Sequence, residues 1–215
     1  MTAVVDLLAD ATPGLRERKK QRTRATLISA AVELCLEQGY EHTTVDQIAA
    51  AAEVSPRTFS RYFATKDAVY LALLEALVNA VAVELDRIPL EVPPLRALKD
   101  AHIAVLGRVR SGRVPGLSSE GIALTLQVIN STHELRMAAG EIESPAILGV
   151  LARRMGVEPG SRRLRLVNTV WSAIIVTGCG DLVVDADGVA LGPDLMSERN
   201  DESYNTFTAL TAHLG

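Results

Sequence analysis

Residues 44–66 read TVDQIAAAAEVSPRTFSRYFATK, and this stretch decides the expected fold. Thr44 and Gln47 have the spacing of a capping box, in which a hydroxyl and an amide side chain satisfy each other's backbone at a helix start. The apolar residues Val45, Ile48, Ala49 and Ala52 then recur at the spacing of one helical face. The stretch therefore predicts a short helix that begins directly after Thr44.

A second short helix is expected to begin at Pro56. Ser55 is a favoured N-cap, and proline suits the first helical position because no amide hydrogen is needed there. Phe59 and Phe63 lie four residues apart, so we expect both rings to face inward. The residues left pointing largely outward are Arg57, Thr58, Ser60 and Arg61. Two short helices joined by a tight turn, the second with a polar and cationic face, predict a DNA-reading helix-turn-helix.

The same residues carry a resemblance to a known family. The stretch TTVDQIAAAAEVSPRTFSRYFATKDAVY resembles the DNA-binding signature of the TetR family of transcriptional regulators, and RTRATLISAAVELCLEQGYEHTT is similar to that family's first helix and its corner. The resemblance covers residues 16–85, and the rest of the chain matches only in length and helicity. Two positions depart from the family pattern: Glu53 stands where a turn glycine is usual, and Ser60 where an aromatic hydroxyl commonly contacts DNA.

Periodicity and resemblance together predict an all-α chain of about nine helices. We expect a flexible tail over residues 1–15 and a three-helix, helix-turn-helix DNA-binding domain over 16–66. A connecting helix over 67–88, capped by Thr65, would lead to a C-terminal helical bundle over 89–215 that binds an effector and dimerises. Pro89, Pro93 and Pro94 mark the boundary of the bundle.

Helix geometry and the resemblance assign the DNA contacts. Arg57, Thr58 and Arg61 are expected at base edges, whereas Thr44, Tyr62 and Lys66 are expected at phosphates. Tyr62 has a second interpretation as a core residue, because it lies three residues from Phe59. The full set of predicted DNA-binding residues is Arg22, Thr44, Pro56, Arg57, Thr58, Ser60, Arg61, Tyr62 and Lys66.

The distribution of charge supports a local nucleic-acid site. The chain as a whole has a net charge of −4, which argues against a general binder of polyanions. Residues 16–24 nevertheless hold six cations and one anion, and residues 16–66 hold nine basic and six acidic residues, a balance of +3. The remainder then carries −7, so a basic N-terminal module precedes an acidic body.

The body reads as a series of apolar helices. We expect helices over 94–110 and 117–130, and one capped by Thr132 that runs to about Met155 with a break near Gly140 and Ser144–Pro145. The most apolar stretch, 162–184, contains Asn168 and Asp181, which argues against a membrane span. A polar loop over 185–200 and a last helix over 201–214, with Tyr204, Phe207 and Leu210 inward, complete the chain.

A helix as apolar as 162–184 needs covering on several sides, which predicts a second copy of the chain. The homodimer is expected through residues 162–184 and 201–214, as the resemblance also implies. Polar residues among the apolar helical positions are candidate contacts to a small apolar or amphipathic effector: His102, Gln127, Asn130, His133, Asn168, Trp171 and Thr177. Trp171 is the strongest candidate, although a tryptophan in a pocket and one in a dimer interface give the same pattern.

Catalytic and metal-binding patterns are absent from the sequence. The four histidines lack metal-ligand spacing, no phosphate-binding loop or nucleophile elbow is present, and no cofactor is expected. Cys35 and Cys179 lie far apart, which fits a reducing cytoplasm. We therefore expect a cytoplasmic repressor that binds an inverted-repeat operator in double-stranded DNA under effector control. The alternative is a helical small-molecule-binding or interaction protein with a non-functional DNA-binding head.

Overall fold

The computed structural model describes residues 14–140, 142, 144–185 and 188–212, and within these ranges it has ten α-helices and no strand. The all-α prediction is confirmed, with ten helices in place of about nine because the helix expected from Thr132 to Met155 is two separate helices. The helices are α1 (Leu15–Gln38), α2 (Val45–Ala51), α3 (Pro56–Tyr62), α4 (Asp67–Leu85), α5 (Pro94–Arg110), α6 (Ser119–Ser131), α7 (His133–Gly140), α8 (Pro145–Met155), α9 (Arg162–Cys179) and α10 (Pro193–Thr211).

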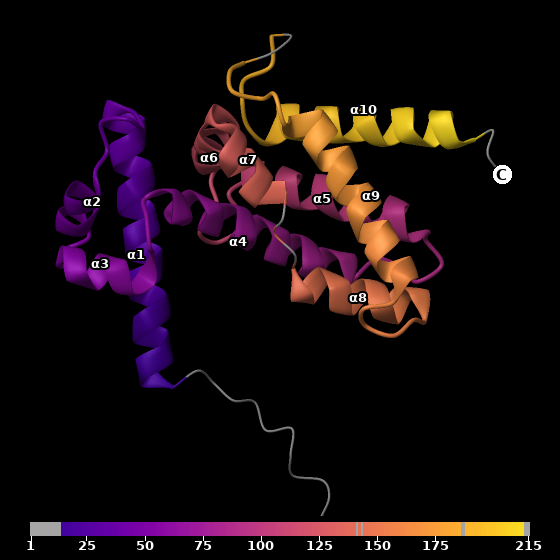
Figure 1. Ribbon diagram of the computed structural model, residues 1–215, viewed down its shortest axis with the longest axis horizontal. Coiled ribbons are helices and arrows are strands. Elements are labelled where there is room, and N and C mark those ends of the chain that lie inside the picture. Colours follow the sequence, from indigo (N-terminus) through magenta and orange to yellow (C-terminus); the bar gives the residue numbers. More distant parts are fainter. Residues whose placement is uncertain (1–13, 141, 143, 186–187, 213–215) are drawn as a thin grey trace, which may run out of the picture.

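Helices α1–α3 lie together at one end of the molecule (Figure 1). Their ends are capped as the sequence predicts: Thr44 accepts from the Gln47 amide at 3.3 Å, the Gln47 side chain accepts from the Thr44 amide at 2.9 Å, and Ser55 accepts from the Thr58 amide at 3.1 Å. Phe59 is buried with its ring centroid 5.7 Å from that of Phe63. The caps fix where α2 and α3 begin, and the buried Phe59 packs α3 against α1 and α2.

The turn between α2 and α3 depends on Glu53. This residue has a φ of +54°, in the left-handed region that glycine adopts without a steric penalty. Among the described residues it is the one non-glycine with positive φ. The Val54 amide closes the turn on the Ala49 carbonyl at 2.9 Å. The turn therefore keeps the left-handed geometry although its usual glycine is replaced.

Helix α4 belongs to both parts of the hydrophobic core. Val69 and Ala72 pack with α1–α3, while Tyr70, Leu73 and Leu77 pack with the body. By length and hydropathy α4 meets the requirements of a membrane span, the one such helix in the described part of the chain. In the fold the apolar residues of α4 pack into the core of α1–α3 and into the core of the body. Helix α4 therefore connects these two parts.

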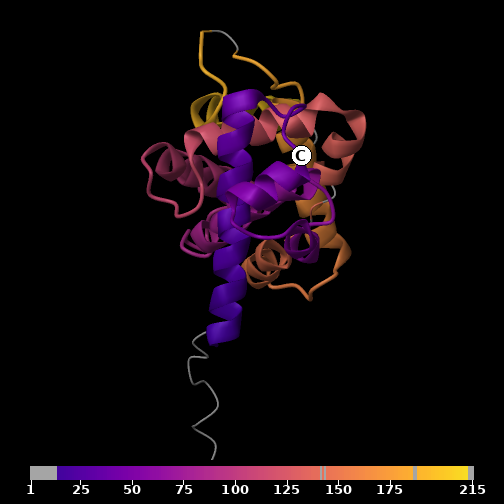
Figure 2. The same cartoon turned by 90° about the vertical axis from the view of Figure 1, so that its left-hand side faces the viewer.

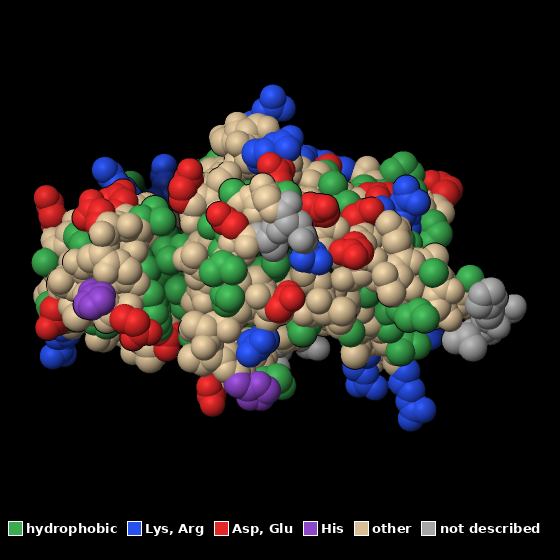
Figure 3. Space-filling model, turned by 90° about the horizontal axis from the view of Figure 1, so that it is seen from above, with side chains coloured by type: hydrophobic (Ala, Val, Ile, Leu, Met, Phe, Trp, Pro, Cys, Tyr) green, Lys and Arg blue, Asp and Glu red, His purple; other side chains and the backbone are tan. Residues whose placement is uncertain are grey.

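The body packs α4–α10 around one core, with α10 lying across α9 and α5 (Figure 1). Gly178 on α9 allows the closest approach, because a Cβ there would lie 2.7 Å from the Arg199 carbonyl oxygen of α10. Gly178 therefore marks a point of close packing between α9 and α10. Seen from above (Figure 3), exposed hydrophobic side chains lie among charged ones on the body, toward the end at which α10 finishes.

Two predicted helix boundaries in the body are wrong. The apolar helix ends at Cys179 rather than 184, because Gly180 terminates it and the chain then turns through Leu182 to Cys179. The last helix begins at Pro193 rather than 201, with proline at its first position after Gly192. On this longer helix Tyr204 and Phe207 are half-buried as expected, but Leu210 is 72% exposed in the single chain.

Candidate DNA-binding surface and effector pocket

The outer face of α3 carries the predicted base-reading residues. Arg57, Ser60 and Arg61 are exposed, and Pro56 opens the helix at the surface. Thr58 is half-buried, with its hydroxyl 3.0 Å from that of Ser55. The two arginines are therefore the long exposed side chains on this face that could reach into a major groove.

The side chains of Ser60 and Tyr62 each contact a nearby residue of α3. The Ser60 hydroxyl donates to the Pro56 carbonyl at 3.1 Å. Tyr62 is half-buried against the core of α1–α3, and the Arg61 guanidinium lies 5.3 Å from its ring centroid. Tyr62 thus combines features of both interpretations, since its ring packs inward while part of the residue stays accessible.

Lys66 is held more tightly than a free phosphate ligand would be. Its amine donates to the carbonyls of Tyr40 and Thr43 at 2.8 and 3.2 Å and lies 3.9 Å from the Tyr40 ring centroid. The Tyr40 hydroxyl in turn donates to Asp67 at the start of α4. Lys66 therefore fixes the corner between α1 and α2 against α4, and its phosphate contact stays a prediction.

The basic start of α1 projects past α2 and α3 (Figure 2). Arg16, Lys19, Lys20 and Arg22 are exposed there. Arg24 is bound instead, with its guanidinium 3.3 Å from Glu75 of α4 and 5.3 Å from the Phe63 ring. The exposed cations form a surface that suits phosphates and carries no base preference.

A pocket in the body is formed by α4–α9 and by Met196 of α10, with a volume of ≈ 130 Å³. Four of the predicted effector contacts line it: His102, Asn130, Asn168 and Trp171. His133, Thr177 and Gln127 are exposed and lie outside the described lining. The polar lining residues that the sequence analysis missed are Arg136, Ser144 and Ser172. Ser172 could have been found from its position four residues after Asn168, but nothing in the pattern of α7 or of the 140–145 break marks the other two.

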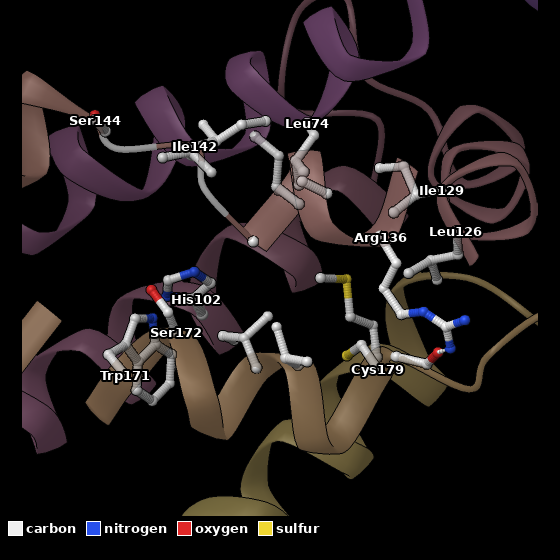
Figure 4. Close-up of a pocket in the computed structure, with 18 of the residues that line it drawn as sticks. Leu74, His102, Leu126, Ile129, Arg136, Ile142, Ser144, Trp171, Ser172 and Cys179 are labelled. Carbon is white, nitrogen blue, oxygen red and sulfur yellow. Dashed lines mark hydrogen bonds between the residues drawn. The ribbon is translucent and has the colours of Figure 1, made fainter. Parts of the chain in front are cut away.

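The two ends of the pocket differ (Figure 4). His102, Trp171 and Ser172 gather at one end, whereas Arg136 and Cys179 lie at the other. The ring centroids of His102 and Trp171 are 4.8 Å apart. The Trp171 indole nitrogen is buried and has no hydrogen-bond partner among the described residues. This end therefore offers an unused donor to a bound molecule.

Arg136 and Asn130 hold the opposite end together. Arg136 donates to the Gly180 carbonyl at 2.8 Å. The Asn130 amide donates to the carbonyls of Cys179 and Leu182 at 2.8 and 2.9 Å. These bonds satisfy the carbonyls that the end of α9 leaves unpaired. Both side chains line the pocket and also donate hydrogen bonds to the backbone at the end of α9.

Burial keeps the His102 imidazole neutral. The pKa of this group is lowered to about 4, chiefly by burial and against the opposing effect of its bond to the Leu98 carbonyl. The Nδ1 atom lies 2.9 Å from that carbonyl oxygen, which can only accept, so Nδ1 carries the proton. The Nε2 atom is then an acceptor.

The pKa of His102 predicts a pH dependence of stability. Because the pKa is lower in the folded chain (about 4) than the ordinary value of 6.5, the unfolded chain takes up the proton first as the pH falls. The contribution of His102 to the free energy of unfolding should be fully present above pH 6.5. It should be lost as the pH falls from 6.5 to about 4, which lowers the free energy of unfolding by up to about 3 kcal/mol. Urea unfolding at a series of pH values checks this. His102→Gln should remove this component and the exposed control His133→Gln should leave it, whereas equal slopes in all three proteins would contradict the assignment.

Comparison with known proteins identifies the family. Residues 27–73 match the model of the bacterial regulatory proteins of the tetR family. Over 166 residues the chain is 40% identical to the HTH-type transcriptional regulator TcmR of Streptomyces glaucescens, a match that covers 75% of this chain and 74% of TcmR. The chain belongs to the TetR family. It is a DNA-binding transcriptional regulator and not an enzyme.

Other relatives of this TetR-family regulator agree. The transcriptional regulator AcuR of Cereibacter sphaeroides is 29% identical over 181 residues, which cover 80% of this chain and 68% of AcuR. The crystal structure of Thermus thermophilus FadR, a TetR-family repressor in complex with lauroyl-CoA, aligns with a TM-score of 0.54 at 22% identity, covering 85% of this chain and 91% of FadR. At that identity the likeness supports the fold alone.

Proposed function

We propose that this TetR-family regulator is a cytoplasmic homodimeric repressor that binds an inverted-repeat operator and is released by a small molecule bound in the body pocket. The observation that carries this proposal is the placement of α4. Its residues Leu74, Leu77 and Val78 line the pocket, and its first residue, Asp67, follows the helix-turn-helix directly. A molecule that displaces α4 therefore acts on the DNA-binding end through one continuous helix.

The two ends of α4 are held by different contacts. At the DNA-binding end, Asp67 accepts from Tyr40, and near the middle of the helix Glu75 pairs with Arg24 of α1 at 3.3 Å. At the far end Glu84 accepts from Arg108 at 2.6 Å, which together with Arg87 holds the pKa of the Glu84 carboxyl below its usual range. The pocket-lining residues Leu74, Leu77 and Val78 lie beside the Arg24–Glu75 pair and between Asp67 and Glu84, so a bound molecule acts on the helix between its two ends. Control of DNA binding by an effector requires such a connection.

The lining of the pocket supports control by an apolar ligand. Aliphatic side chains make up much of it, including Leu126, Ile129 and Ile147. We therefore assign a mainly apolar effector to this regulator.

A second copy of the chain is proposed to cover the exposed face of α9. Leu166, Thr169 and Ala173 recur on that face and are exposed, with Leu166 65% accessible. Ile174, which turns away from that face, is 4% exposed within one chain. The first turn of α9 is basic, with Arg162, Arg163 and Arg165. The middle of α10 carries the acidic residues Glu198 and Glu202. Two copies packed through these helices would place apolar residues together and pair the charges.

The experiment that tests the proposed function is a gel shift with the DNA beside the regulator's own gene, followed by footprinting. We expect protection of two half-sites about one helical turn apart. Release of the DNA by small molecules that also raise the melting temperature of the protein would establish effector control. Ligand binding without any DNA binding would favour the alternative of a binding protein with a non-functional head.

Replacing Arg57 should reduce sequence selectivity. Arg57→Ala removes a long cationic side chain from the exposed start of α3, and we expect operator binding to weaken by about 1–3 kcal/mol while binding to random DNA changes little. The matched control is Arg22→Ala on α1, which should weaken operator and random DNA equally and reduce the salt dependence. Fluorescence anisotropy at several salt concentrations measures both. An equal loss on the two DNAs for Arg57→Ala would contradict base reading by this residue.

A further inference from the structure

We propose that the pocket takes an uncharged, mainly apolar molecule of about one ring that carries a hydroxyl group, and that this hydroxyl bonds Trp171 and His102. This inference rests on the proposed effector control and specifies the chemical class of the effector. It follows from the hydrogen-bonding groups, the charge and the size of the pocket, each considered in turn.

The indole nitrogen of Trp171 needs an acceptor. Trp171 is 4% exposed, lines the pocket, and its N–H has no partner among the described residues. A buried donor without a partner is unfavourable, and such groups in native proteins call for an explanation. An acceptor on a bound molecule at this end of the pocket would satisfy it.

The neighbouring histidine needs a donor. Nδ1 of His102 is used on the Leu98 carbonyl, which leaves Nε2 as an acceptor beside the Trp171 ring. Ser172 lies at the same end (Figure 4), and Asn168 is one turn earlier on α9. One donor next to one acceptor complements a group that accepts and donates at once. A hydroxyl does both, whereas a carbonyl or an ether oxygen only accepts.

The charge of the lining argues for an uncharged molecule. Among the described lining residues Arg136 is the one charged side chain, and it lies at the opposite end bonded to the Gly180 carbonyl. No carboxylate among them could pair with an ammonium group. A carboxylate placed beside Trp171 and the neutral His102 would be removed from water without a cation to compensate. Both kinds of ion are therefore expected to bind worse than an alcohol or a phenol.

The volume of the pocket limits the size of the molecule. At ≈ 130 Å³ it is close to the engineered cavity of about 150 Å³ that binds benzene. Most of the remaining lining is aliphatic, with Leu74, Val78 and Ile175 among its members. A single ring with a short alkyl chain and a hydroxyl matches both the volume and the lining.

The test compares three probes of one shape: 4-propylphenol, propylbenzene and 4-propylbenzoate. Calorimetric titration of the full chain should show 4-propylphenol binding at least about tenfold more tightly than either of the others, because a site built for a hydroxyl rejects an analogue without one. In Trp171→Phe, which keeps an aromatic ring but removes the donor, the preference for the phenol over propylbenzene should fall to about threefold or less.

Three results would overturn the inference: tighter binding of the benzoate, a preference for the phenol that survives Trp171→Phe, and no binding by any probe. If 4-propylbenzoate binds more tightly than the other probes, and this difference in affinity disappears in Arg136→Gln, the pocket selects anions through Arg136 instead. If Trp171→Phe does not fold, the wild-type ranking of the probes still decides. A gel shift without any probe tests operator binding separately, so failure of this inference is distinguishable from failure of the proposed function.

Discussion

Replacing Arg154 with methionine is expected to lower the free energy of unfolding by about 3 kcal/mol, because it leaves four backbone carbonyls, three of them in partly buried bonds, without their donor. The Arg154 guanidinium, on α8, donates to four backbone carbonyls at the end of α4 and in the turn that follows it: Leu85 (3.1 Å), Ile88 (2.6 Å), Pro89 (2.6 Å) and Val92 (3.1 Å). Methionine fills similar space but donates nothing. Urea unfolding at one fixed protein concentration, followed by the fluorescence of Trp171, measures the effect.

The neighbouring residue provides a matched control. Arg153 pairs with Asp86 at 2.7 Å, but both side chains are about 60% exposed, so Arg153→Met should change the free energy of unfolding by less than about 1 kcal/mol. Arg154→Lys should fall between the two, because an ammonium has three donors and no planar fork. Equal stability of Arg153→Met and Arg154→Met would show that the four bonds contribute no more than an exposed ion pair.

The Arg154 contacts also bear on how the effector acts. Arg154 and Arg108 fix the C-terminal end of α4 to α8 and α5. The N-terminal end is held by the Tyr40–Asp67 bond, and the middle of the helix by the partly exposed Arg24–Glu75 pair. Because the far end is the more firmly bonded, displacement of Leu74 and Val78 by a bound molecule should appear mainly at the DNA-binding end.

Local chemistry made the DNA-binding end predictable from sequence. Thr44, Ser55 and Pro56 act within a few residues of themselves, so their capping roles could be read without tertiary information. The break between α7 and α8 was likewise marked by Gly140 and Pro145. The left-handed turn at Glu53 was not predictable in the same way, because the sequence showed only that a glutamate stands where the family usually has a glycine.

The pocket could be predicted only in part, because tertiary packing assembles it. His102 and Trp171 lie on different helices, and their polar character among apolar residues was the available signal. Arg136 enters the lining because α7 folds back onto the end of α9, which no spacing in the sequence encodes. The start of α10 was missed for a different reason: Pro193 was a readable first-position proline, but the surrounding glycines and aspartates indicated a loop.

A charge on the outer face of α9 should abolish tight operator binding. Leu166→Glu and Ala173→Glu each place a carboxylate on the exposed stripe that we propose to pack against a second copy. Burying it there without a partner would dissociate the dimer. A monomer contacts one half-site, so we expect affinity for the operator to fall at least about 100-fold while the folded chain persists. Sedimentation and anisotropy on the same samples measure assembly and DNA binding together.

The choice of position on α9 is what makes this test specific to assembly. A charge at Ile174, which is buried within one chain, would disturb the core and could not separate misfolding from dissociation. Leu90→Glu is the matched control, since Leu90 is an apolar residue that is 67% exposed in the turn between α4 and α5. That variant should remain dimeric and bind the operator normally. A wild-type chain that sediments as a monomer at micromolar concentration and still binds a palindromic site tightly would reject the dimer through α9 and α10.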